Sequence, residues 1–499
     1  MRAAEFARLR TLAETLAPER ARPVAAAAKA GAPRTDAALV SIVADALAAG
    51  TAAETWLALA VLRAELPTRD LVIATRRRLR FEHPADLVKE LLAHPVRRGT
   101  LGMGGVREVR IISDAVFLDV HHTARTGLAT GIQRVVRKTI EQWEAEHPVV
   151  VVGWGSTYGG MRELSAPERE NALHGTNPHA PKPKTGEVTI PWKSTYILPE
   201  LAIESERVAR IAALAEFSGN RTCVIGYDCV PLTSADTIGA GMGAAFAKNL
   251  TAVARMQKVA AISVAAKLEY QGWRRMLSGA GMSGPDIREI VLPREAGTVT
   301  DQQLEDARLV LITGDLPLVL CVGSHEPRKN HLAVLQAAEQ LWMAGREFSL
   351  VFVGGNSWGS QDFERQLARL QADGRPVSTI AAVTDELLWS AYRLSAVTVF
   401  PSLNEGYGLP VAEALAVGTP VVTSNFGSMQ EIASQGGALL ANPRDDDGIA
   451  AAIDQVVFDE ATNRRLRDET TRITPRDWSD YATELWDYFV VPHGASAAP

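Results

Sequence analysis

Hydrophobic and polar positions along the chain change their pattern near residue 110. From there on, short apolar runs alternate with segments in which apolar residues recur every three or four positions, the spacing of one helix face. Five runs predict strands of a parallel sheet: AVFLDV (115–120), PVVVVGW (148–154), STYILPE (194–200), TCVIGYD (222–228) and VAAIS (259–263). The polar, proline-rich residues 161–193 predict a loop or insertion without a core of its own.

The second half alternates more strictly between the two patterns. Strands are expected at 318–323, 349–355, 378–383, 397–402, 420–425 and 437–442. Helices are expected between them, at about 330–344, 361–373, 385–394, 409–417 and 428–434. Such alternation predicts a doubly wound parallel sheet. Two α/β units in succession place a cleft between the carboxyl ends of two sheets, where this class of fold binds ligands.

The first hundred residues show no strand alternation and predict helices near 2–17, 36–49, 52–66 and 84–94. Thr51 is a cap for the third helix, Pro67 ends it, and Pro84 opens the fourth. The glycine-rich GTLGMGG (99–105) joins these helices to the first α/β unit. We therefore expect four parts: a helical N-terminal extension (1–105), a Rossmann-like acceptor domain (110–305), a Rossmann-like donor domain (306–475), and a terminal helix crossing back with a tail (476–499).

Composition and charge narrow the class of protein. The 499 residues are 46% hydrophobic and 22% charged, as in ordinary globular proteins, and the net charge of -6 gives no reason to expect nucleic acid as a partner. Three cysteines form no disulfide framework, which suits the cytoplasm. Glu5 and Glu14 interrupt any signal peptide, and no apolar run approaches a membrane span. Membrane contact is therefore expected to be peripheral.

The most informative stretch is FPSLNEGYGLPVAEALAVGTPVVTSN (400–425). A strand ends at Ser402, a loop runs through Glu405, and a helix begins near Leu409. Glycines at 406 and 408 let the backbone approach a ligand, and the helix start offers free N–H groups, so the segment predicts a diphosphate seat. Glu413, eight residues after Glu405, suits the hydroxyls of a ribose. The plainer alternative is two solvated glutamates flanking a turn.

This run resembles the signature of the retaining nucleotide-sugar glycosyltransferases of family four, which have the GT-B fold. The resemblance is strong over about 315–480, loose over about 110–300, and does not cover the first hundred residues. It implies that Glu405 contacts the donor sugar and Glu413 the ribose. It also implies donor binding by the loop between them, namely Gly406, Tyr407, Gly408 and Leu409.

A second constellation, CVGSHEPRKNHLAVLQA (321–337), places Arg328 and Lys329 directly before a helix. Cations there are unfavourable unless an anion lies between them and the helix dipole, and a diphosphate would meet that need. The alternative is a solvated basic turn. The pair resembles the family's phosphate clamp, with one departure: Ser324 stands where many members have arginine, which leaves the clamp one charge short.

Weaker signals complete the expected site. Val383 and Thr384 resemble the family's base-binding loop. Gly131 and Arg134 lie in LDVHHTARTGLATGIQRVVRK (118–138), which resembles the loop that closes over the donor phosphates. Asp228 follows a strand and is expected to face the cleft and contact sugar or acceptor. The alternatives are ordinary strand ends and a glycine-rich loop without a ligand.

Two features invite a metal interpretation. His121 and His122 are adjacent, so on a strand they point apart, and packing or acceptor contact is the favoured role. Asp445, Asp446 and Asp447 precede a helix, where acidic residues cap and favour the dipole. We therefore expect neither a metal nor any other cofactor, since helix dipoles and basic side chains can neutralise a leaving diphosphate.

The sequence thus predicts a metal-independent, retaining hexosyltransferase that uses a nucleotide-diphosphate sugar. The EPRKN form of the clamp resembles mannosyl-type enzymes, which makes GDP-mannose the first donor candidate, and the family implies a glycan or lipid-linked acceptor in bacterial surface polysaccharide synthesis. A GT-B sugar-nucleotide epimerase and a catalytically silent sugar-nucleotide-binding scaffold are the alternatives.

RDLVIATRRRLR (69–80) in the extension packs five arginines among apolar residues. On a helix this is either an amphipathic surface for anionic lipid or a solvated or subunit-facing helix, and the second interpretation is favoured because the apolar face is short. The accompanying hypothesis is that residues 1–105 serve location or self-association and that the cleft does not need them.

Overall fold

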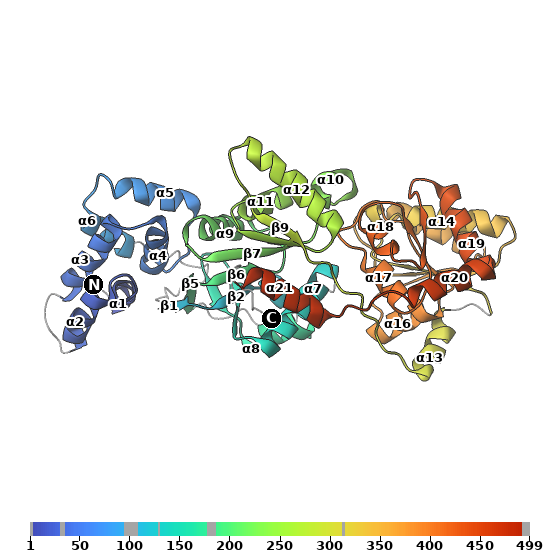
Figure 1. The fold of residues 1–499 in the computed structure, drawn as a ribbon, viewed down its shortest axis with the longest axis horizontal. Helices are drawn as coiled ribbons and strands as arrows, with labels where there is room; N and C mark the ends of the chain where they lie inside the picture. Colours follow the sequence, from blue (N-terminus) through green and yellow to red (C-terminus); the bar gives the residue numbers. More distant parts are fainter. Residues whose placement is uncertain are drawn as a thin grey trace, which may run out of the picture.

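The computed structural model describes residues 3–29, 35–93, 108–127, 130–176, 186–311 and 315–491. Three parts succeed one another along the long axis of the molecule: a helical extension, a first α/β domain and a second α/β domain (Figure 1). The glycine-rich joint predicted at 99–105 lies outside the described residues.

The extension consists of helices, as predicted. They are α1 (Ala3–Leu16), α2 (Pro18–Lys29), α3 (Thr35–Ala48), α4 (Ala52–Arg63), α5 (Arg69–Arg78) and α6 (Pro84–Ala93). Thr51 caps α4 in a reciprocal capping box with Glu54, and Pro84 begins α6. Helix α2 was not predicted, because Pro23 inside it interrupts the helical pattern.

The extension and the first domain share one hydrophobic core. Leu57 and Val61 of α4 belong to the same buried cluster as Phe117 and Trp154 of the first sheet. An ion pair between Arg69 and Glu216 adds a polar contact. The extension is therefore an integral part of the first domain rather than a separate appendage.

Helix α5 turns its apolar side toward the protein. Val72 and Thr75 are buried, Arg69 pairs with Glu216, and Arg78 pairs with two glutamates of the extension. The apolar side chain of Val72 is thus packed against protein, while Arg76, Arg77 and Arg80 are exposed. This placement favours the protein-facing interpretation of residues 69–80.

The first sheet has nine strands in the order β1-β5-β4-β3-β2-β6-β7-β8-β9. They are β1 (Glu108–Ser113), β2 (Val116–Asp119), β3 (Val149–Trp154), β4 (Met161–Glu163), β5 (Glu187–Trp192), β6 (Thr195–Leu198), β7 (Arg221–Gly226), β8 (Lys258–Ala261) and β9 (Asp286–Glu289). All pairings are parallel except those of β4. The five predicted strands are present as β2, β3, β6, β7 and β8, in this sheet.

Residues 177–185 lie outside the described residues; residues 161–176 and 186–193 do not form the predicted loop without a core, so the prediction was wrong for them. They contain β4, helix α8 (Ala166–His174) and β5, whose Val188 and Ile190 are buried. The polar residues that suggested a loop have structural partners, since Ser165 and Glu168 form a capping box and Glu168 pairs with buried Arg162 at 2.6 Å.

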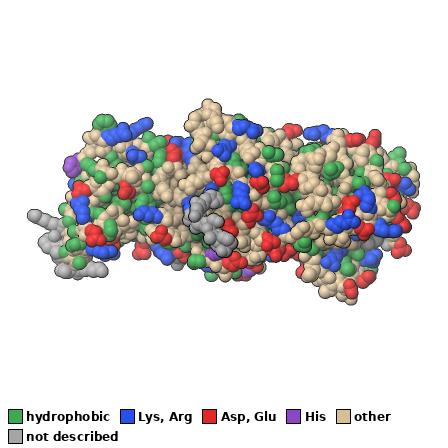
Figure 2. All heavy atoms as spheres, viewed as in Figure 1, with side chains coloured by type: hydrophobic (Ala, Val, Ile, Leu, Met, Phe, Trp, Pro, Cys, Tyr) green, Lys and Arg blue, Asp and Glu red, His purple; other side chains and the backbone are tan. Residues whose placement is uncertain are grey.

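Helices cover both faces of the first sheet (Figure 1). Besides α8 they are η1 (Thr123–Arg125), α7 (Gly131–Glu146), α9 (Ser205–Phe217), α10 (Val230–Thr233), η2 (Ala235–Thr237), α11 (Met242–Val253) and α12 (Val264–Gly279). Basic and acidic side chains are interspersed on the face shown in Figure 2, which agrees with the nearly balanced charge of the chain.

The second domain has the six predicted strands in one parallel sheet, ordered β12-β11-β10-β13-β14-β15. They are β10 (Leu318–Val322), β11 (Ser349–Val353), β12 (Val377–Ile380), β13 (Val397–Phe400), β14 (Val421–Ser424) and β15 (Ala438–Ala441). Its helices are α13 (Asp301–Leu311), η3 (Pro327–Lys329), α14 (His331–Met343), α15 (Gln361–Ala372), α16 (Asp385–Leu394), α17 (Leu409–Ala416), α18 (Gly427–Ala433), α19 (Asp446–Phe458) and α20 (Glu460–Thr470). The doubly wound architecture is confirmed.

The last helix, α21 (Trp478–Phe489), returns to the first domain (Figure 1). The indole of Trp143 in α7 donates to the Ala482 carbonyl at 2.9 Å. On the way, the two connections between the domains meet, since the Arg294 amide donates to the Arg476 carbonyl at 3.1 Å. Within the described residues, no helix combines the length and apolar character needed to cross a membrane.

Candidate active site

The glycine loop of the second domain ends in the start of helix α17. Gly408 is the N-cap of that helix at φ 107°, in the left-handed region that glycine tolerates best, and Pro410 lies in the first turn. The Leu409 N–H has no partner within the helix and lies at its positive end, whereas Pro410 has no N–H and the Val411 and Ala412 amides donate to the Gly408 carbonyl. The segment therefore has the geometry of an anion seat.

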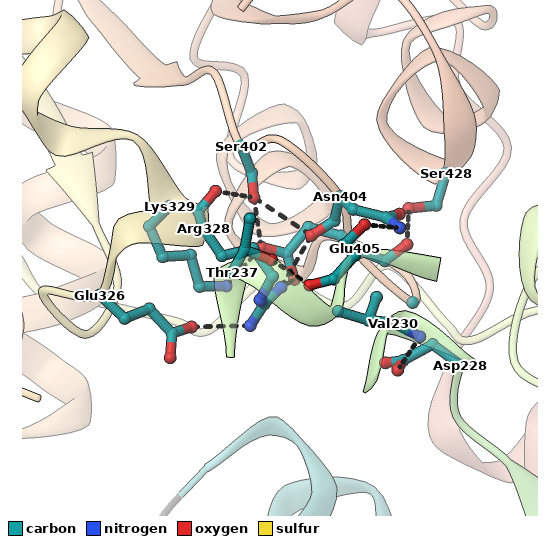
Figure 3. Close-up of polar contacts among 12 residues, drawn as sticks. Asp228, Val230, Thr237, Glu326, Arg328, Lys329, Ser402, Asn404, Glu405 and Ser428 are labelled. Atoms are coloured by element: carbon teal, nitrogen blue, oxygen red, sulfur yellow. Dashed lines mark hydrogen bonds and ion pairs between the residues drawn. The ribbon is translucent and has the colours of Figure 1, made fainter. Parts of the chain in front are cut away.

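Glu405, in the same loop, is surrounded by cations (Figure 3). Lys329 Nζ lies 2.6 Å from Oε1 and Arg328 Nη1 lies 2.7 Å from Oε2, while the Ser402 hydroxyl donates to Oε1 at 2.7 Å. Burial by itself would raise the pKa of Glu405, but the two cations outweigh it and lower the pKa to about 2. Glu405 is therefore a fixed, ionised carboxylate at any physiological pH.

Arg328 and Lys329 lie on η3, directly before helix α14, as the sequence indicated. Arg328 also pairs with Glu326 at 2.7 Å and donates to the Asn404 carbonyl at 2.8 Å. The carboxylates of Glu326 and Glu405 therefore supply the counter-charge that the sequence pattern assigned to a diphosphate alone. Glu326 was not singled out from the sequence, although it lies two residues before Arg328.

Glu413 lies inside α17 and is contacted from both domains. Its side chain is 9% exposed, Tyr392 donates to Oε2 at 2.8 Å, and Arg134 of the first domain forms an ion pair with Oε1. Burial raises the pKa of Glu413, and Arg134 opposes this effect. Arg134 also lies 5.6 Å from the centroid of the Trp389 ring. Arg134 and Glu413, both predicted to bind donor, are thus brought together.

Two glycines allow the first domain to approach this loop closely. A Cβ on Gly131, at the start of α7, would lie 3.2 Å from the Leu409 side chain. A Cβ on Gly406 would lie 2.7 Å from Asp228 Oδ2, and the Gly406 carbonyl accepts a hydrogen bond from Ser263 at 2.6 Å. The carboxyl ends of β7 and β8 therefore meet the glycine loop.

Asp228 is the titratable group at this meeting point. Its Oδ1 accepts a hydrogen bond from the Val230 amide at 3.1 Å. Burial raises the pKa of Asp228 to about 6, with the charge of Arg328 acting in the opposite direction. Such a perturbed carboxyl next to a ligand seat is typical of functional sites.

Other predicted site residues have structural contacts. The Tyr407 side chain is buried and its hydroxyl donates to the Leu292 carbonyl at 2.9 Å, in the connection between the domains. Thr384 caps α16 by accepting from the Leu387 amide at 3.3 Å, and Val383 packs partly buried against the core. The base-binding role of Val383 and Thr384 stays a prediction.

A small pocket lies beside Glu413. Its lining comes from both domains and from their connections: Arg134, Pro293, Arg294, Glu295, Leu409, Ala412, Glu413 and Trp478. The predicted ribose contact therefore borders an open space between the domains.

The residues considered for a metal have other contacts. His121 is buried, and its Nδ1 accepts from the Trp154 amide at 2.9 Å. Asp445 caps α19 by accepting from the Gly448 amide at 3.0 Å, which confirms the capping interpretation. Within the described ranges, no group of three or more His, Cys, Asp or Glu residues is arranged to hold a metal ion.

Comparisons with known proteins agree with this architecture. Residues 302–472 match the family described as glycosyl transferases group 1. O-antigen chain mannosyltransferase B of Escherichia coli is 36% identical over 143 residues, 28% of this chain and 37% of that protein. The serotype-specific mannosyltransferase WbdA of Escherichia coli is 24% identical over 250 residues, 48% of this chain and 30% of that protein. The matches thus span only about a third of these relatives' own lengths.

Among solved structures, Anabaena HepE in complex with UDP and glucose superimposes with a TM-score of 0.54 at 12% identity, over 75% of this chain and 99% of that chain. At this identity the likeness concerns the fold. The GT-B arrangement predicted from the sequence, with two Rossmann-like domains, is confirmed.

Proposed function

We propose that this chain, which has the GT-B fold and whose residues 302–472 match the glycosyl transferases group 1, transfers a hexose from a nucleotide-diphosphate sugar with retention of configuration. The observation that carries the proposal is the convergence of Glu405, Lys329 and the start of α17 on one loop. A fixed carboxylate, a cation and a free N–H at a helix start are groups that suit a sugar joined to a diphosphate.

The donor is assigned to this loop group by group. The diphosphate lies at the Leu409 N–H, at the positive end of α17, near Lys329 and Arg328. Glu413 accepts hydrogen bonds from the ribose hydroxyls, and Glu405 accepts from the transferred sugar. Arg134 is close enough to Glu413 to change partners from that carboxylate to the diphosphate when donor binds.

In the reaction, the acceptor hydroxyl oxygen bonds to the anomeric carbon while the bond from that carbon to the diphosphate oxygen breaks. The hydroxyl proton passes to the departing diphosphate, which serves as the base. The chain's own part is positioning and charge stabilisation, since Arg328, Lys329 and the helix dipole neutralise the leaving group. We propose that no metal or other cofactor is needed.

GDP-mannose is the first donor candidate. The motif Glu326–Asn330 resembles that of mannosyl-type transferases, and the two Escherichia coli relatives are named as mannosyltransferases. One of them acts on the O-antigen chain by its name, which supports a glycan or lipid-linked acceptor in surface polysaccharide synthesis. Cys223, Cys229 and Cys321 are buried and free, which supports our proposal of a cytoplasmic location.

A thermal-shift screen across GDP, UDP, ADP and TDP tests the donor base, because only a ligand that binds the native state raises the midpoint. GDP is expected to give the largest shift. Incubation with GDP-mannose then tests the chemistry by chromatography of nucleotide and sugar products. Release of GDP that increases with added acceptor supports transfer. An altered sugar on an intact nucleotide would indicate an epimerase, and binding without any turnover would indicate a scaffold.

A further inference from the structure

A second group of functional side chains lies outside the donor site, at the carboxyl edge of the first sheet. The loop between β3 and β4 carries Tyr158 at φ 53°, in the left-handed region that a bulky side chain rarely adopts. Such a conformation is strained and persists where surrounding contacts enforce it, often at ligand sites. Tyr158 is half-buried and lies edge-on to the His121 ring, with centroids 5.4 Å apart.

The helical extension holds this loop from behind. The Leu66 amide, just after α4, donates to the Gly159 carbonyl at 2.8 Å. Within the loop, the Tyr158 amide donates to the Gly155 carbonyl at 3.0 Å. Glu65 pairs with Arg210 of α9, which anchors the same turn of the extension. The loop that carries the strained residue is therefore held by the bond from Leu66, whose neighbour Glu65 anchors the extension to α9.

A buried charge network fixes the neighbouring turn. Arg207, fully buried, pairs with Asp119 at 2.9 Å and with Glu200 at 2.8 Å. Glu200 in turn accepts hydrogen bonds from the His122 amide at 2.7 Å and the Thr123 amide at 2.8 Å. Burying these charges carries a desolvation cost. In exchange, the turn that begins at His121 is held in one position beside Tyr158.

Arg125 lies on that turn and is half-buried. Its side chain forms no ion pair with any residue that the structure describes. A guanidinium is a strong donor to carboxylate or phosphate, so this position suits an anionic group of a ligand. Because parallel strands share a carboxyl edge, Tyr158 and Arg125 lie on the edge at which β7 and β8 meet the second domain.

We infer that Tyr158 and Arg125 form a subsite for the acceptor, in which a pyranose ring packs its apolar face on Tyr158 and an anionic substituent pairs with Arg125. The inference rests on the proposed function, because the donor groups lie on the second domain and leave this edge to the acceptor. It also changes the role of the extension. Its residues 64–66 position the Tyr158 loop, in contrast to the hypothesis that the cleft does not need residues 1–105.

Titration of mannose 1-phosphate and methyl α-mannoside into the full chain saturated with GDP tests the subsite by calorimetry. Wild type is expected to bind both, with the phosphate tighter. Tyr158→Gly relieves the positive φ and is expected to weaken both sugars at least tenfold while GDP binding is unchanged. Arg125→Gln is expected to remove only the preference for the phosphate.

Lys193→Gly is the matched control, because Lys193 has φ 51° but lies exposed at the amino end of β6. It should relieve the same kind of strain without any effect on sugar binding. Amide exchange of Leu66, followed by mass spectrometry, should slow when mannose 1-phosphate binds.

The inference is overturned if wild type with bound GDP takes up neither sugar, if Tyr158→Gly binds both as wild type does, or if Lys193→Gly shows the same loss. If Arg125→Gln still prefers the phosphate, Arg125 does not bind the anionic substituent. If the exchange of the Leu66 amide is unchanged by mannose 1-phosphate, the extension does not position the Tyr158 loop. Failure of wild type to bind GDP at all would instead contradict the proposed function.

Discussion

Arg134 of the first domain forms an ion pair with Glu413 of the second, 279 residues further along the chain. Tyr392 holds the other carboxylate oxygen at 2.8 Å. The two residues thus satisfy each other across the domain boundary without donor. In the donor complex, a ribose diol has to compete with Arg134 for Glu413 Oε1, so binding and domain contact are coupled at this pair.

The pair makes donor affinity sensitive to Glu413. We expect Glu413→Ala to weaken GDP binding at least tenfold, because it removes the acceptor of the ribose hydrogen bonds, and hydrogen bonds to charged groups contribute about 1.5–3 kcal/mol. Calorimetric titration with GDP measures the loss. Lys138→Ala, one turn further along α7 where Lys138 pairs only with Glu141, is the control. Wild-type affinity in Glu413→Ala would remove Glu413 from the donor site.

Glu405 should affect turnover more than binding. Its proposed contact is with the reacting sugar, so we expect Glu405→Gln to lower kcat about 100-fold or more while GDP affinity changes less than threefold. Initial rates of GDP release from GDP-mannose, together with titration of GDP, separate the two effects. Ser428→Ala is a useful comparison, since its hydroxyl donates to the Glu405 main-chain carbonyl at 2.9 Å and its loss leaves the contacts of the Glu405 carboxylate in place. Equal losses of binding and turnover would contradict the assignment.

Charge neutralisation by the protein predicts activity without a divalent ion. We expect full turnover in excess chelator and a loss of about 100-fold or more in Lys329→Ala, because Lys329 is the cation closest to Glu405 and the proposed diphosphate. GDP release assayed with and without chelator tests both parts. Activity that disappears with chelator and returns with magnesium or manganese would overturn metal independence.

Asp228 predicts a specific dependence of stability on pH. Its pKa is about 6 in the folded protein, raised by burial, against about 3.9 in an unfolded chain. Because the folded value is the higher one, the stabilising contribution of the protonated form is complete below about pH 4 and is lost as pH rises through 6. Asp228→Asn has no titrating carboxyl at this position and therefore lacks this pH-dependent contribution to stability. Between pH 4 and 7 wild type should therefore lose about 2 kcal/mol more unfolding free energy than the variant, by urea titration. Parallel curves would show that the carboxyl is solvated.

The second domain could be predicted because its strands, glycine loop and helix start are each recognised from residues that are neighbours along the chain. The four central strands of that sheet, β10, β11, β13 and β14, are short, fully buried and mostly apolar, and the glycine loop and helix start of residues 405–409 can be read directly from residue type. Strands β1 and β5 were missed because polar and proline residues flank or interrupt them. The two strands are stabilised by pairing with each other and by packing against the extension. A local sequence pattern does not reveal such contacts between distant residues.

The contacts that define the site could not be predicted in the same way. The ion pair of Arg134 with Glu413 and the network around Arg207 join residues far apart in the chain, and spacing carries no information about them. Tyr407 illustrates the limit. Its position in the motif suggested donor binding, but its side chain turns away to the connection between the domains.

That contact leads to a last prediction. The Tyr407 hydroxyl donates to the Leu292 carbonyl at 2.9 Å, so the loop that carries Glu405 is bonded to the connection between the domains. Tyr407→Phe keeps the ring and leaves a buried carbonyl unpaired, which should lower unfolding free energy by about 1–3 kcal/mol. If the bond also sets the loop position, GDP affinity should fall several-fold.

Tyr488→Phe is the control, since its hydroxyl donates to the Asp286 carbonyl at 3.1 Å, away from the loop. It should lose comparable stability in thermal unfolding with no change in GDP binding. Equal GDP affinity in both variants would show that the Tyr407 bond stabilises the fold without positioning the loop.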